Sequence, residues 1–344
     1  MKKNITGILY FYIHFIVEIA CFFYLSRVTN GSNVVWLIPF IYDGVAFVPQ
    51  SIIGYISDKY PKINMAFIGT ILMIISYLIF GLTKWSVFIS LIIICLGNAF
   101  LHVAGAENTL KTSGGRLSPS AIFVAGGSFG VITGKVLAMS SINPLWLLIP
   151  IMTIIPFSIL ADMYIEKDSN TVKFNYVREC LNPYVVILIA FLVVIARGYV
   201  GYGIPTSWNK TVIQNIIFFC TMGLGKALGG ILSDKIGIRK VAIGSTLFAI
   251  PFLCCGNNLM IVSIIGVMFF SMTMSITLGI LTSILKKNPG LAFGITTIGL
   301  FLGTAPIFFI KLTMNINIIL IIIVSIICSI LLGYVLKGDE KKWK

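Results

Sequence analysis

Two short segments decide the fold: GYISDK at residues 54–59 and GILSDK at residues 230–235, which share the pattern G-x-[IL]-S-D-K. They begin 176 residues apart, close to half of the 344-residue chain, and each follows a long apolar run. A repeat at half-length predicts two copies of one structural unit. Parallel copies of a helical unit are one of the architectures of polytopic membrane proteins.

The composition around these segments places the chain in a membrane. Apolar residues make up 58% and charged residues 10%, and the mean hydropathy is +1.02, whereas a soluble domain is usually about 25% charged. The sequence contains twelve apolar runs of about the length that a spanning helix needs. These predicted helices occupy residues 5–28, 34–57, 63–83, 87–106, 119–140, 144–160, 184–201, 212–233, 241–255, 259–285, 290–310 and 316–336.

The basic residues indicate how the helices are oriented. With the N-terminus inside, 18 of the 25 Lys and Arg residues fall in cytoplasmic segments and four fall outside. This satisfies the positive-inside rule. The net charge of +14 is thereby explained by topology, and nucleic-acid binding loses its motivation.

The longest polar stretch lies near the middle of the chain. We therefore predict an all-α membrane protein of twelve helices in two bundles of six, with both termini cytoplasmic. The predicted units are a bundle at 1–162, a cytoplasmic linker at 163–182 and a second bundle at 183–344.

The repeated motif resembles the cytoplasmic signature loop of the major facilitator superfamily. Its second copy continues as IGIRK at 236–240, as that family's loop does, whereas the first has Pro61 where a glycine is usual. An anionic turn at a helix end can hold a neighbouring helix N-terminus in one conformation and release it in another. The predicted gating residues are Gly54, Asp58, Lys59, Gly230, Asp234, Lys235 and Arg239.

A second resemblance covers residues 97–135. LH at 101–102, SGGR at 113–116, GGSFG at 126–130 and Gly134 are similar to the fourth and fifth helices of fosmidomycin-resistance-type bacterial exporters. Departures are Val103 and Ala104 after the histidine and Lys135 after Gly134. The resemblance implies efflux of a drug or metabolite across a bacterial plasma membrane.

Two enzyme motifs are excluded by their context. GGSFG matches G-x-S-x-G, but a nucleophile elbow needs a preceding strand, and this segment is predicted to be helical. GK at 134–135 and at 225–226 lacks the first glycine and the Ser/Thr of a phosphate-binding loop. We therefore predict no nucleotide site, no cofactor and no enzymatic activity. A polytopic membrane enzyme would need catalytic residues clustered at one interface.

Ionisable residues inside the predicted helices are unevenly distributed. Runs 63–83, 144–160, 241–255 and 316–336 contain none, and the superfamily resemblance implies that these are outer helices. A charged group at mid-membrane is costly, so each remaining one needs a cavity or a partner. These groups are His14, Glu18, Asp43, His102, Glu107, Lys135, Arg197 and Lys226.

Two interpretations of these residues stay open. In one, Arg197 and Lys226 bind an anionic substrate, with His14, Tyr199 and Tyr202 nearby, while the proton-coupling groups are Glu18, Asp43, Glu107 and His102. In the other, acids of the first half pair with bases of the second as structural ion pairs. His102 and Glu107 are as consistent with a gate as with substrate binding, and Lys135 is expected to extend toward the interface.

A metal site formed by His14, Glu18 and His102 has no spacing signature, and none is predicted. The sequence thus favours a secondary transporter of a small solute that uses protons as the coupling ion. Proton-coupled uptake of an organic anion is the alternative to efflux.

Further glycines are predicted to mediate close packing. Gly126, Gly130 and Gly134, together with Gly225 and Gly229, are expected to let the two halves of the chain approach each other, because small residues four apart form a smooth helix face.

Overall fold

The computed structural model describes residues 5–30, 36–164 and 171–338, and within them the regular secondary structure is helical apart from one isolated bridge between Val177 and Leu336; turns and short irregular segments connect the helices. The helices are α1 Ile5–Thr29, α2 Leu37–Phe47, α3 Gln50–Lys59, α4 Met65–Ile79, α5 Lys84–Thr112, α6 Ser118–Ala138, η2 Pro144–Leu147, α7 Leu148–Asp162, α8 Pro183–Gly203, α9 Val212–Ile236, α10 Ile238–Cys255, α11 Met260–Ser271, α12 Met274–Ile284, α13 Pro289–Thr304, η3 Ala305–Phe308 and α14 Met314–Val335.

Eleven helices of the described residues are long and apolar enough to cross a membrane, counting α2 with α3 and α11 with α12 as single spans. The remaining apolar helix, α4, has 15 residues and is shorter than the predicted run at 63–83. It ends early because Phe80 is extended (ψ 123°) and Gly81 has a positive φ of 78°, a conformation that favours glycine. The chain is a multi-pass helical membrane protein, while twelve crossings remain a prediction.

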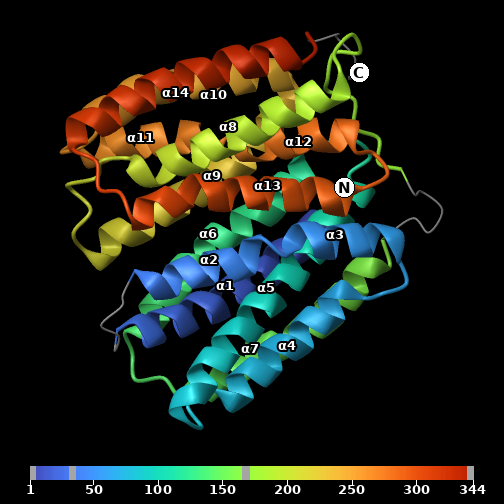
Figure 1. The fold of residues 1–344 in the computed structure, drawn as a ribbon, viewed down its shortest axis with the longest axis vertical. Coiled ribbons are helices and arrows are strands. Elements are labelled where there is room, and N and C mark those ends of the chain that lie inside the picture. Colours follow the sequence, from blue (N-terminus) through green and yellow to red (C-terminus); the bar gives the residue numbers. More distant parts are fainter. Residues whose placement is uncertain (1–4, 31–35, 165–170, 339–344) are drawn as a thin grey trace.

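The two halves of the chain occupy different parts of the molecule. In Figure 1 the blue-to-green helices from α1 to α7 gather in the lower part and the yellow-to-red helices from α8 to α14 in the upper part. Contacts between the halves run mainly along α6 with α9 and along α3 with α13. The division into two six-helix bundles remains a prediction, but these two pairs form the seam at which the halves meet.

Both ends of the described chain lie at one end of the bundle. Gly7, near the start of α1, packs against Pro119 at the start of α6, with Pro119 Cα 2.9 Å from where a glycine Cβ would be. At the other terminus, the Lys337 N–H donates to the Tyr176 carbonyl (2.9 Å), and the Tyr176 hydroxyl donates to the Gly115 carbonyl (2.6 Å). The cytoplasmic placement of this end remains a prediction.

The segment after residue 170 ties the halves together at this end. Its Val172 N–H donates to the Lys286 carbonyl (3.0 Å), and the Tyr176 N–H donates to Ser283 Oγ (3.1 Å). Burial raises the pKa of the Tyr176 hydroxyl well above its usual range, so the hydroxyl remains a donor to Gly115. Residues 165–170 of the predicted linker lie outside the described residues.

The predicted role of the glycine faces is wrong in its partners. Gly126, Gly130 and Gly134 of α6 pack against the backbone of α1, within the first half of the chain. The smooth face predicted from their four-residue spacing exists, but spacing does not say which helix it meets.

Two of the predicted glycines, on α9, also pack within their own half of the chain. Gly225 and Gly229 face Met268 and Met272, within the second half. Glycines that do meet the other half include Gly223, against Phe129, and Gly230, against Ala121 and Leu117, together with the mutual contact of Gly54 and Gly290.

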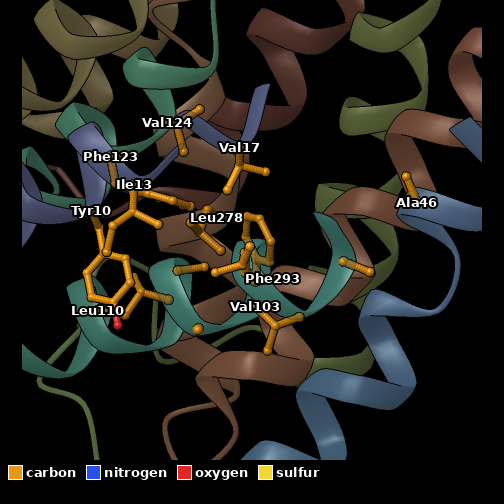
Figure 2. Close-up of a cluster of buried hydrophobic side chains, with 14 of the residues drawn as sticks. Tyr10, Ile13, Val17, Ala46, Val103, Leu110, Phe123, Val124, Leu278 and Phe293 are labelled. Carbon is orange, nitrogen blue, oxygen red and sulfur yellow. The ribbon is translucent and has the colours of Figure 1, made fainter. Parts of the chain in front are cut away.

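One apolar core spans both halves. Figure 2 shows Tyr10, Ile13 and Val17 of α1 with Phe123 of α6 and Phe293 of α13 in a single cluster. All five side chains are buried. Ionisable groups among these helices are thus enclosed by hydrocarbon and depend on the contacts described next.

Candidate functional site

The two copies of the repeated motif make equivalent contacts across the seam. In the first copy, Asp58 at the end of α3 accepts hydrogen bonds from the N–H groups of Gly290 (3.0 Å) and Leu291 (2.9 Å), at the start of α13. These N–H groups have no partner within their own helix, and the helix dipole favours a negative charge there. Asp58 therefore caps a helix of the other half.

The second copy repeats this arrangement in the opposite direction. Asp234 at the end of α9 accepts from the N–H groups of Leu117 and Ser118 (both 2.8 Å), at the start of α6. We call the two contacts, Asp58 with the start of α13 and Asp234 with the start of α6, the paired clasps. They close the same end of the molecule, while their role in gating remains a prediction.

The other predicted gating residues surround the clasps. Lys59 and Lys235 are exposed, and Lys59 Nζ lies 5.5 Å from the centre of the Tyr60 ring. Arg239 lines a surface hollow together with Gly338. Gly54 is the point at which α3 meets Gly290 of α13.

Glu107 lies beside a clasp, away from the other predicted coupling groups. Its carboxylate accepts from the Ser57 hydroxyl, one residue before Asp58, and forms an ion pair with Lys111 one turn along α5. The Ser57–Glu107 hydrogen bond thus connects α5 to α3, the helix that carries the first copy of the motif. This contact fits the interpretation of Glu107 as part of a gate.

A buried cluster forms where α1, α5 and α6 meet. Glu18 Oε1 lies 3.6 Å from His14 Nε2, 3.2 Å from His102 Nε2 and 3.2 Å from Asn98 Nδ2. The two histidine rings are 4.4 Å apart between centroids, and each contacts the ring of Phe123. We call His14, Glu18 and His102 the triad.

Sequence reasoning missed Asn98, which organises this region. Besides Glu18, its amide nitrogen contacts Cys21 Sγ (3.4 Å) and the Tyr42 hydroxyl (3.1 Å). Asn98 is four residues before His102, so both lie on one face of α5. That spacing is the signal by which a polar residue next to the predicted groups could have been found.

Asp43 on α2 is isolated by comparison. It is buried, and among the described residues no hydrogen bond or ion pair reaches its carboxylate. Tyr202 has 62% of its surface exposed, and Tyr199 is half-buried.

Arg197 lines an internal cavity of about 20 Å³ between the halves. Val124 of α6 and Thr296 of α13 share this lining. One guanidinium nitrogen donates to the Phe270 carbonyl (3.3 Å), the guanidinium stacks over the Phe270 ring (5.3 Å), and the buried Nε has no hydrogen-bond partner in the described part of the chain.

Lys226 lies on α9 and is half-buried. Within the described ranges, neither Arg197 nor Lys226 forms an ion pair with a carboxylate. The structural ion pairs that the sequence left open are thus not formed in this conformation.

The ammonium of Lys135 lies between two aromatic rings. It lies 5.5 Å from the centre of the Phe22 ring and 4.8 Å from that of Phe219. It thereby joins α1 and α6 to α9 at the end opposite the paired clasps.

Comparison with solved structures identifies the fold. The human organic anion transporter MFSD10 superimposes with a TM-score of 0.68 at 11% identity, covering 96% of this chain and 99% of that one. A variant of the E. coli fucose:proton symporter FucP gives 0.67 at 14% identity, covering 97% and 99%. No protein-family profile matches the sequence. No curated protein matches it at a significant level either.

Proposed function

The chain has the fold of major facilitator superfamily transporters, and from this premise we propose that it is a secondary active transporter of a small anionic solute, coupled to protons and working by alternating access. Efflux is the preferred direction, on the resemblance of residues 97–135 to bacterial exporters. Proton-coupled uptake of an organic anion is the second candidate. It is favoured by the functions of the two structural neighbours, an organic anion transporter and a proton symporter.

The guanidinium of Arg197, whose buried Nε has no acceptor among the described residues, carries the substrate assignment. A permanent positive charge removed from water needs an anion or an equivalent set of dipoles. The Arg197 guanidinium contacts one carbonyl and one aromatic ring, both of Phe270. Its Nε has no hydrogen-bond acceptor among the described residues. A carboxylate or phosphate of a solute would supply the missing acceptor and match the planar fork of the guanidinium.

The cavity at Arg197 fits a transporter between substrate-bound states. At about 20 Å³ it has room for roughly one water molecule and not for a solute. On one side the paired clasps close the bundle, and on the other Phe40 packs against Phe301 and Phe309 with centroid distances of 5.7 and 5.1 Å. Binding therefore requires one of these closures to open.

We assign proton coupling to Asp43 among the four predicted groups. Glu107 is paired with Lys111 beside a clasp, and Glu18 and His102 both belong to the triad. Asp43 is a buried carboxylate without a partner, and a proton is the simplest way to neutralise it. Its binding and release of a proton would couple to the substrate through the opening and closing of the seam between the halves.

The test is a thermal-stability screen on purified protein in lipid nanodiscs. Small carboxylates and phosphate esters are compared with their neutral amides and alcohols. We expect anions to raise the melting temperature of the wild type, and Arg197→Gln and Lys226→Gln to lose that response. Lys210→Gln, which removes an exposed charge outside the cavity, is the matched control.

The same screen distinguishes substrate binding by Arg197 from a structural ion pair between Arg197 and a carboxylate. Without a carboxylate partner, Arg197→Gln leaves the ligand-free protein at least as stable as wild type. A destabilised ligand-free Arg197→Gln protein, restored by Asp43→Asn and still responsive to anions, would refute the substrate assignment.

A further inference from the structure

Both histidines of the 344-residue chain meet at one carboxylate. His14 comes from α1 and His102 from α5, 88 residues apart, and the three triad residues are only 6–7% exposed. The three possible ligand atoms, two imidazole nitrogens and a carboxylate oxygen, all lie within 4.8 Å of one another.

The outer nitrogen of each ring fixes its tautomer. His14 Nδ1 lies 2.9 Å from the Phe123 carbonyl oxygen, and His102 Nδ1 lies 3.0 Å from the Asn98 carbonyl oxygen. A carbonyl oxygen only accepts, so each Nδ1 must carry the hydrogen. In neutral imidazole the other nitrogen, Nε2, then presents a lone pair. Both Nε2 atoms face Glu18.

The triad therefore brings three acceptors together. Two Nε2 lone pairs face Glu18 Oε1 at 3.6 and 3.2 Å, and the only donor that reaches this oxygen from the described residues is Asn98 Nδ2. A single proton can bridge only one of the two nitrogen–oxygen pairs and leaves the other repulsive. A cation with several coordination positions satisfies all three atoms at once.

We propose that His14, Glu18 and His102 form a binding site for a divalent transition-metal cation of the zinc class. Imidazole suits this class of metal, and two histidines with one glutamate are a ligand set that leaves a further position open for water or a solute. With metal–ligand distances of about 2.0–2.2 Å, a tetrahedral site has ligand–ligand edges of about 3.3–3.6 Å. The distances of 3.2 and 3.6 Å from Glu18 match these edges.

The surroundings support a prepared site. Metal-binding histidines usually donate the other ring N–H to a carbonyl or carboxylate, which holds the ring in place, and both histidines here do so. Gly127 makes room for the His14 ring, because a Cβ there would lie 2.5 Å from His14 Cε1 and Nε2. Phe123, which contacts both rings, also packs against Phe293 at the central cavity (6.3 Å).

This proposal is independent of the transport proposal, because it concerns binding in the resting protein. The first test is calorimetric titration of Zn²⁺ into purified protein that carries no histidine tag, with the exposed Cys180 and Cys255 changed to serine. We expect one ion per chain. His14→Ala and His102→Ala should each weaken binding by about 100-fold or more, beyond the ~10–100-fold typical of losing an outer-shell partner. Asp162→Asn, which changes an exposed acid outside the triad, should bind as the parent does.

A glycine pair tests the geometry without removing a ligand. Gly127→Ala should displace the His14 ring and weaken Zn²⁺ binding by about 10-fold or more, whereas Gly244→Ala, which meets nothing within 4 Å, should not. Equal Zn²⁺ affinity in these two variants would count against the site, as would unchanged affinity in both histidine variants.

Nitrogen-15 NMR of the two labelled histidines gives a readout that does not depend on any variant folding. We expect Nδ1–H tautomers in the metal-free protein and a large shift of both Nε2 signals, but not of Nδ1, when Zn²⁺ is added. Two doubly protonated rings that ignore Zn²⁺ would show that the triad binds protons only and overturn the proposal.

Discussion

The paired clasps lead to a prediction that separates a gate from two ordinary helix caps. Each carboxylate uses one oxygen for each of two N–H groups of the opposite half. Changing Asp234 to Asn leaves one acceptor oxygen, so one of the two hydrogen bonds is lost, and the negative charge disappears from the α6 N-terminus.

The expected destabilisation of the closed conformation follows from the lost hydrogen bond and the lost charge. A hydrogen bond to a charged group contributes about 1.5–3 kcal/mol and the charge–dipole interaction about 0.3–1 kcal/mol, and the remaining neutral bond offsets part of the loss. We therefore expect the closed conformation to lose about 1–2 kcal/mol relative to the open one. This corresponds to about a 5–30-fold increase in the open population.

Hydrogen–deuterium exchange with mass spectrometry measures this change at the capped amides. Asp234→Asn should raise exchange in peptides containing Leu117 and Ser118, and Asp58→Asn in peptides containing Gly290 and Leu291. If the clasps open together when the halves rock, each substitution should also raise exchange at the clasp it does not touch.

The control variant lies outside the seam, and the refuting result is a change in exchange at one clasp alone. Glu179→Gln breaks an exposed ion pair with Lys337, outside the seam, and should leave both clasps unchanged. Increased exchange confined to the substituted clasp in both variants would mean that Asp58 and Asp234 are independent helix caps, and the gating role would be wrong.

Three further outcomes are expected. Asp43→Asn should abolish solute accumulation driven by a pH gradient while sparing energy-independent exchange. The control Asp162→Asn should alter neither activity. Solute accumulation by both variants would exclude Asp43 as the coupling group. Gly126→Ala should lower the melting temperature, because overpacking against α1 costs about 1–3 kcal/mol, while Gly230→Ala should mainly raise amide exchange at the seam; the reverse ranking would contradict the observed partners. Tyr176→Phe should reduce stability by about 0.5–1.5 kcal/mol by removing the hydrogen bond to the Gly115 carbonyl, and no change in denaturant midpoint would show that this bond contributes nothing.

The all-helical membrane architecture could be predicted because hydropathy and the repeated motif act over long stretches. Runs of about 20 apolar residues have few alternatives in a bilayer, since backbone groups must be satisfied within the segment. Helix ends were less predictable. The break of α4 at Phe80 and Gly81 depends on two local backbone angles that the apolar pattern does not encode.

The candidate site was predictable only as a set of residue types. Burial cost picks out Glu18, Asp43 and Arg197 from the sequence, but their partners depend on how helices rotate about their axes. His14 and Glu18 share a helix face by spacing, whereas His102 joins them only through the packing of α5 on α1. The glycine faces failed for the same reason, because Gly126 and Gly225 could have met either half.

The most direct measurement of the central claim is pH-driven transport in proteoliposomes of the anion that stabilises the protein most strongly. With the vesicle interior and exterior at unequal pH, the wild type should accumulate or expel this anion against its gradient, and collapsing the pH gradient with an uncoupler should abolish the effect. Arg197→Gln should lose both uphill transport and exchange, and Asp43→Asn only uphill transport. Transport equally fast in empty liposomes, or a wild type that moves neutral analogues as well as the anion and is unaffected by Arg197→Gln, would contradict the account.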